Sequence, residues 1–161
     1  MVTDLFSATT YYFALKAYDE AGNPSGRSNA PWEITAGISW YLCSPADMIV
    51  TDPDGLTISK ELNEIPGATY TEIDINGDGD PDDVVNIFNR KLGDYLIIVI
   101  PEPDASPTDT YALGVSADGV TIVLAENVRM VDIPTEGYTV RSTETDVRQI
   151  IPQSGLSLIH I

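Results

Sequence analysis

Basic residues are scarce in this chain, and their scarcity excludes several classes of partner. Eight Lys and Arg residues stand against 25 Asp and Glu residues in a chain of 161, which gives a formal net charge of −17 at pH 7. Nucleic acids and anionic membrane surfaces are bound mainly through Lys and Arg side chains. No apolar run in the sequence is long enough to span a bilayer. We therefore expect no nucleic-acid partner and no membrane insertion.

Cysteine and histidine occur once each, as Cys43 and His160. A single cysteine excludes an internal disulfide and the zinc sites that are built from paired cysteines. A Ser/His/Asp triad or a Cys/His dyad would have to use His160, which is the next-to-last residue. We expect Cys43 to be a small buried apolar residue, and we expect the chain not to be an enzyme.

Helical periodicity is missing from residue 47 onward, where short extended segments alternate with turns rich in Gly, Pro and Asp. Hydrophobic residues still make up 43% of the chain, an ordinary content for a folded protein. Segment 95–100 is apolar on both faces, as expected of a central strand that lies between two layers. These features predict an all-β fold, an antiparallel immunoglobulin-like β-sandwich of about eight strands.

The first 36 residues alternate with a period of two and contain a turn rich in Gly, Asn and Pro, which predicts a β-hairpin. This stretch resembles the last two strands of a fibronectin type III module. The family pattern is filled by Leu5, Thr9, Tyr11, Phe13, Leu15, Ala17, Asp19, Gly22, Asn23 and Ser25. The resemblance implies that Tyr11 is the corner tyrosine of such a module, whose earlier strands this sequence lacks.

The sequence predicts four segments. Residues 1–36 are the truncated hairpin, 37–46 a linker, 47–145 a calcium-binding β-sandwich and 146–161 a tail. Residues 44–55 resemble the first strand and turn of immunoglobulin-like modules in secreted microbial proteins. The last six residues, LSLIHI, look like a translated sequencing adapter, so we expect the tail to be non-native from about residue 156.

One acidic loop, DINGDGDPDD at 74–83, carries the clearest chemistry. Oxygen-bearing side chains occupy its positions one, three, five and nine, as Asp74, Asn76, Asp78 and Asp82, and Asp80 at position seven offers its backbone carbonyl. Calcium takes six to eight oxygen ligands and tolerates irregular geometry. Like charges this close also repel one another unless a cation neutralises them. We therefore expect a Ca²⁺ site, with Asp83 at position ten solvated.

The loop begins like an EF-hand loop, but Val85 stands at position twelve, where that motif has a bidentate Glu. It is more similar to the calcium loop of FG-GAP and VCBS repeats, in which a D-x-[DN]-G-D-G-x-x-D motif precedes a Val-rich strand. That resemblance implies a calcium loop between two strands. The competing interpretation is a solvated acidic turn. Other acidic residues are interpreted as ordinary turn residues: Asp52, Asp54, Asp104, Asp109 and Asp118.

These features predict a non-catalytic, calcium-stabilised module of a modular secreted or cell-surface protein, with a role in spacing or adhesion. Its expected partners are neighbouring domains of the same parent protein and a polysaccharide or cell-surface ligand. The alternative is a carbohydrate-binding module of a secreted hydrolase, with Trp32, Trp40, Tyr41 and Tyr95 as its aromatic platform. A carboxylate-based enzyme is the weakest interpretation, and the acidity would also fit a high-salt habitat.

Overall fold

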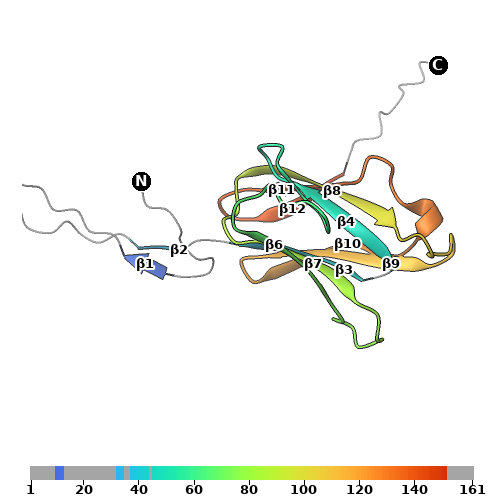
Figure 1. The fold of residues 1–161 in the computed structure, drawn as a ribbon. Helices are drawn as coiled ribbons and strands as arrows, with labels where there is room; N and C mark the ends of the chain where they lie inside the picture. The colour runs from blue at the N-terminus through green and yellow to red at the C-terminus, as the bar shows by residue number, and fades with distance from the viewer. Residues whose placement is uncertain (1–9, 13–31, 35–36, 44, 152–161) are drawn as a thin grey trace, which may run out of the picture.

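The computed structural model describes residues 10–12, 32–34, 37–43 and 45–151 of the chain. Those residues form an all-β structure whose ten main strands lie in two antiparallel sheets of five (Figure 1). The first sheet has the order β10 (Val120–Arg129), β9 (Thr110–Ala117), β3 (Ile38–Cys43), β7 (Asp82–Ile87) and β6 (Ala68–Ile73). The second has the order β12 (Val147–Ile150), β11 (Tyr138–Ser142), β8 (Gly93–Pro101), β4 (Ala46–Thr51) and β5 (Thr57–Ile58).

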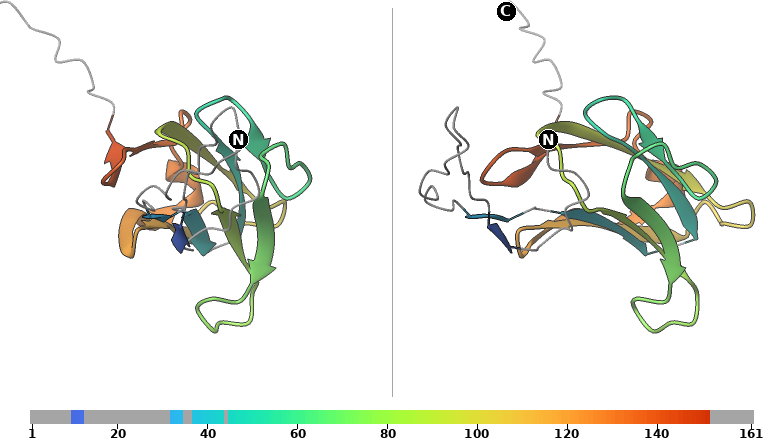
Figure 2. Two further views of the ribbon diagram at one scale, coloured as in Figure 1. Left: turned by 90° about the vertical axis from the view of Figure 1, so that its left-hand side faces the viewer. Right: turned by 60° about the vertical axis from the view of Figure 1, so that its left-hand side comes forward.

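The two sheets face each other as the layers of a β-sandwich, which confirms the predicted all-β class and the antiparallel sandwich (Figure 2). The sandwich has more strands than the eight expected, because two segments outside the predicted boundaries also pair into sheets. The helical content of the described residues is one short 3₁₀ turn, Met130–Asp132, and no helix there could cross a membrane.

The core lies between the sheets and follows from the alternation of each strand. On β3, Ile38, Trp40 and Leu42 are buried, while the residues between them are half-buried. The ring of Trp40 packs against that of Tyr95 on the opposite sheet, with ring centroids 5.1 Å apart. Both side chains are fully buried, so this aromatic pair fixes the two layers against each other.

The domain boundaries differ from those expected. The predicted linker, 37–46, contains β3, which pairs with both β7 and β9 and is the central strand of the first sheet. The predicted tail, 146–161, begins with β12, which pairs with β11. Both segments are short and flanked by turn residues, so local pattern gave no sign of the long-range pairing that makes them part of the sandwich.

Two strands of three residues also pair in the N-terminal part of the chain. β1 (Thr10–Tyr12) is antiparallel to β2 (Trp32–Ile34), with Tyr11 opposite Glu33. This pairing agrees with the predicted hairpin over 1–36. The predicted role of Tyr11 as a corner tyrosine concerns its side chain, and the predicted non-native end lies beyond residue 151, so both fall outside the described residues.

Candidate functional site

The acidic loop joins β6 to β7, the last pair of strands at one edge of the first sheet. The two strands pair up to Ile73 opposite Asp82, and the residues between them project beyond the sandwich (Figure 1). Gly77 and Gly79 have positive φ angles of 82° and 96°, which residues with a side chain rarely adopt. The sequence correctly placed this loop between two strands, and the two glycines let it turn back sharply.

Side-chain oxygens in the loop bind its own backbone amides. The carboxylate of Asp74 accepts hydrogen bonds from the amides of Gly77 and Gly79, at 2.6 and 3.1 Å. Asn76 Oδ1 accepts from the amide of Asp78, and Asp78 Oδ1 accepts from the amide of Asp80, both at 2.9 Å. The loop is therefore folded around the oxygens of three of its predicted ligands.

Asp82 closes the base of the loop. Its carboxylate accepts hydrogen bonds from the amides of Ile75, at 2.8 Å, and Asn76, at 3.3 Å, and the residue is only 2% exposed. Because Asp82 is also the first residue of β7, these bonds tie the start of the loop to the sheet. Asn76 therefore contacts two other predicted ligands. Its backbone amide donates to Asp82, and its side-chain Nδ2 donates to Asp78 Oδ2 at 2.9 Å.

The five predicted site residues occupy one loop but do not converge on one point. Among the described residues, no three His, Cys, Asp or Glu side chains are grouped closely enough to hold a metal ion. Side-chain oxygens of four of the five instead accept hydrogen bonds from loop amides, namely those of Asp74, Asn76, Asp78 and Asp82. The donor set itself, carboxylate and amide oxygens with a flexible backbone, is of the kind that calcium prefers.

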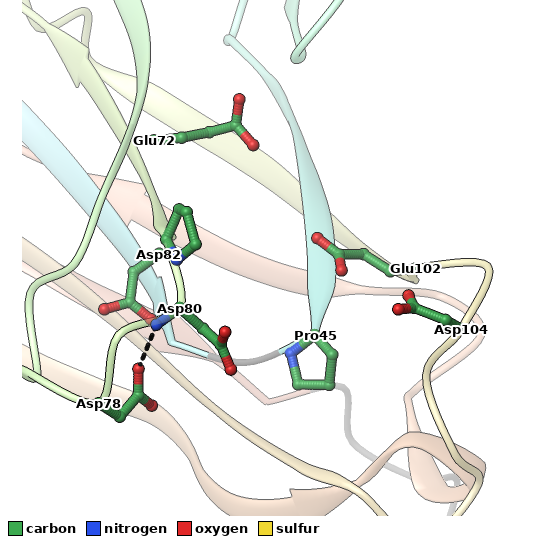
Figure 3. Close-up of a pocket in the computed structure, with 8 residues that line it drawn as sticks. Pro45, Glu72, Asp78, Asp80, Asp82, Glu102 and Asp104 are labelled. Carbon is green, nitrogen blue, oxygen red and sulfur yellow. Dashed lines mark hydrogen bonds between the residues drawn. The ribbon is translucent and has the colours of Figure 1, made fainter.

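A cavity of about 220 Å³ lies beside the loop, and six carboxylates line it (Figure 3). Asp78, Asp80 and Asp82 come from the loop and its base, while Glu72 comes from β6. Pro45 and Pro81 complete the lining, together with Glu102 and Asp104, which follow from the end of β8. Burial, and then the charges of Asp47 and Asp104, raise the pKa of Glu102.

Sequence reasoning missed part of this acidic cavity. Glu72 and Glu102 were not singled out, and Asp104 was interpreted as a turn residue. Their positions in the sequence carry no local signal, because the cavity forms only when the β6–β7 loop and the connection after β8 are brought together by the two sheets. So many carboxylates in one place repel one another.

Asp83 is buried, so the prediction that it is solvated is wrong. It is 4% exposed and faces the interior beside Leu42, its pairing partner on β3. The hydroxyl of Tyr70 donates a hydrogen bond to its carboxylate. Burial raises the pKa of Asp83 to about 6; the bond from Tyr70 opposes this shift, and the charge of Asp47 adds to it.

The lone thiol lies close to the same loop. Cys43 is half-buried at the end of β3, rather than fully buried as predicted. Burial, followed by the negative charge of Asp82, raises the pKa of Cys43. A raised pKa disfavours the thiolate, which is the reactive form of cysteine.

The predicted aromatic platform is not assembled. Trp40 and Tyr95 are fully buried between the sheets, and Tyr41 is half-buried on the outer face of β3. The side chain of Trp32 lies outside the described residues. Stacking on a sugar needs exposed ring faces, which Trp40 and Tyr95 do not offer.

A scan against protein-family models, a search of curated proteins and a search of solved structures each found no match to this chain.

Proposed function

We propose that this chain is a non-catalytic module of a modular secreted or cell-surface protein, in which calcium stabilises the β-sandwich and the module serves spacing or adhesion. The observation that carries the proposal is the β6–β7 loop. It places Asp74, Asn76 and Asp78 at alternate positions around two positive-φ glycines, and Asp82 anchors its base. Calcium would take over side-chain oxygens that now accept bonds from loop amides.

The physical role of the ion follows from charge and from chain entropy. Asp74, Asp78, Asp80 and Asp82 lie within nine residues, so a divalent cation relieves their mutual repulsion. If calcium binds the folded loop and not the unfolded chain, the free energy of calcium binding adds to the stability of the fold. A rigid β6–β7 hairpin at the sheet edge would then present a fixed surface to a neighbouring domain or to a cell-surface ligand.

The expected affinity is modest because the bidentate Glu of an EF-hand loop is replaced by Val85. Extracellular modules bind calcium with dissociation constants of about 10⁻⁴ to 10⁻³ M. At about 10 mM calcium this corresponds to about 1.4–2.7 kcal/mol of added stability. For a domain of this size the melting temperature should rise by about 5–10 °C.

The test is thermal unfolding of the full chain, followed by circular dichroism, in calcium and in chelator. Because Asp74 and Asp78 also accept bonds from loop amides, Asp74→Ala and Asp78→Ala should lower the melting temperature even in chelator. The diagnostic quantity is therefore the difference between the two conditions. We expect both variants to lose most of the calcium-dependent rise.

The matched control is Glu144→Ala, which removes one negative charge from an exposed residue in the β11–β12 turn. It should keep the full response to calcium, and magnesium at the same concentration should not replace calcium, since it requires a tighter octahedral shell. A melting temperature that is the same in calcium and in chelator would refute the metal site.

The burial of Trp40 and Tyr95 supports the spacing or adhesion role over the carbohydrate-binding alternative. A polysaccharide ligand would have to be held by contacts other than the stacking platform expected from the sequence. Titration of the chain with soluble polysaccharides, measured by calorimetry with and without calcium, distinguishes the two roles. Binding that requires calcium would favour the carbohydrate-binding alternative.

A further inference from the structure

Asn76 is followed directly by Gly77 in the β6–β7 loop, and no other asparagine of the chain precedes a glycine. The backbone nitrogen of the residue after an asparagine is placed to attack the side-chain carbonyl carbon and close a five-membered ring. A side chain on that residue hinders the attack, whereas glycine leaves the backbone open to close approach. The space where a Cβ of Gly77 would lie is also empty, so the approach to its nitrogen is unhindered.

The hydrogen bonds of the loop place three groups where this attack needs them. Asp74 Oδ1 accepts from the amide of Gly77 at 2.6 Å, so a base already lies on the proton that the nitrogen must lose. The amide of Asp78 donates to Asn76 Oδ1 at 2.9 Å, where it stabilises negative charge that develops on this oxygen. Asn76 Nδ2 donates to Asp78 Oδ2, also at 2.9 Å, which holds the side-chain amide in this orientation.

We propose that Asn76 is a site of spontaneous covalent modification, at which the loop converts this side-chain amide into a carboxylate. The nitrogen of Gly77 bonds to Cγ of Asn76 while its proton passes to Asp74. The bond from Cγ to Nδ2 then breaks, and Nδ2 leaves with that proton as ammonia. Water adds to one carbonyl carbon of the cyclic imide and opens the ring, which yields aspartate or isoaspartate. Overall, one water is consumed and one ammonia is released.

The fold directs this reaction to one asparagine. Asn76 is exposed, so water reaches the cyclic imide. Asn86 lies within β7, where its Oδ1 accepts a hydrogen bond from a serine hydroxyl of β3 at 2.6 Å, and Ile87 follows it. Asn63 donates to a backbone carbonyl oxygen at the start of β6 and is followed by Glu64. In both cases a side chain on the next residue blocks the route that is open at Gly77.

The modification changes the loop in two ways. Either product adds a negative charge beside Asp74 and Asp78, which increases their mutual repulsion. Aspartate keeps an oxygen that can accept from the amide of Asp78, whereas isoaspartate lengthens the main chain by one methylene and displaces that oxygen. The reaction needs no metal ion, so it does not depend on the calcium site proposed above.

The test is incubation of the full chain at neutral pH in chelator, with samples taken over time. Ion-exchange chromatography separates the product, because it carries one more negative charge, and peptide mapping by mass spectrometry with electron-transfer fragmentation locates it and distinguishes isoaspartate from aspartate. Asn76 should be modified before any other asparagine. Asp74→Asn keeps the shape of the side chain but removes the base, and it should slow the reaction about tenfold, less than a strong general base contributes.

The matched control is Asp80→Asn, which removes the same charge from the same loop. The Asp80 carboxylate lines the cavity, and Pro81 follows it without a backbone N–H, so the new asparagine has no route to the cyclic imide. This variant should modify Asn76 at the wild-type rate, and Asn76→Gln should lose the product because its ring would need six members. Circular dichroism verifies that each variant keeps the β-sandwich.

Two results would overturn the proposal. One is a wild-type chain in which Asn76 is modified no faster than the other asparagines. The second is an equal rate at Asn76 in Asp74→Asn and in Asp80→Asn, which would show that Asp74 does not take the proton.

Discussion

Substitution of Asp83 by Asn tests the energetics of the most unusual carboxylate in the structure. Asp83 is 4% exposed, accepts a hydrogen bond from Tyr70 and lies near the charge of Asp47. Asn has nearly the same shape and keeps an oxygen that Tyr70 can reach, but it cannot ionise. The variant therefore removes the titration of this group while it leaves the packing between β6 and β7 in place.

The direction of the pH dependence follows from the pKa of Asp83 in the folded and in the unfolded state. Burial raises the pKa of Asp83 to about 6 in the folded protein, whereas an unfolded chain has a value of about 3.9. The folded state therefore holds this proton more tightly, and stability falls as the pH rises from about 4 to about 6. Two pKa units correspond to about 3 kcal/mol. As the pH rises from 4 to 7, we expect the free energy of unfolding of Asp83→Asn to increase by about 2–3 kcal/mol relative to that of the wild type.

The assay is urea unfolding of wild type and variant at several pH values, in chelator so that no metal binds the adjacent loop. Asp94→Asn is the control, because Arg141 holds the pKa of Asp94 below its ordinary value. The stability contributed by that pair is present at neutral pH and is lost only as the pH falls below about 4. If the difference between wild type and Asp83→Asn is flat from pH 4 to pH 7, the raised pKa is refuted.

Two further predictions concern backbone strain and a buried ion pair. Gly137 has a φ of 72°, and a Cβ there would overlap the carbonyl oxygen of Ile97 on β8. Gly137→Ala should therefore destabilise the fold by at least about 3 kcal/mol. Gly114→Ala is the control, because its Cβ would make only an ordinary contact, and it should change the midpoint of urea unfolding little. Asp52 is buried and accepts a bond from Lys91 at 2.6 Å, so Asp52→Ala should cost about 2–4 kcal/mol. Asp54→Ala removes a mostly exposed partner of the same lysine, and it should lower the free energy of unfolding by less than about 1 kcal/mol. Equal losses of stability in Asp52→Ala and Asp54→Ala would contradict the role of burial.

The turn chemistry near Asp52 shows what local sequence can predict. Asp, Pro and Gly at 52–55 predicted a turn in which Asp52 caps its own backbone, and its Oδ1 does accept bonds from the amides of Asp54 and Leu56, both at 2.9 Å. The acidic loop was likewise placed between two strands. These features depend on residues only a few positions apart, so no knowledge of the fold is needed to predict them.

Pairing over long distances was not predictable in the same way. β3 was interpreted as a linker although it is the centre of the first sheet, because a strand of six residues carries no information about which distant strand it will join. For the same reason Glu72, Glu102 and Asp104 were not connected with the loop whose cavity they share.

By itself the sequence determined the all-β class, the acidic character and the position of the oxygen-rich loop, since alternation, composition and turn residues act within a few neighbours. Only the tertiary structure decided that Asp83 is buried, that Trp40 and Tyr95 are core residues and that β8 leaves one apolar face uncovered. A strand has two faces, and the order of apolar and polar residues along it shows whether the two faces have different polarity or the same polarity. Which face meets another layer depends on where the second sheet packs, and that is settled by contacts between residues far apart in the chain.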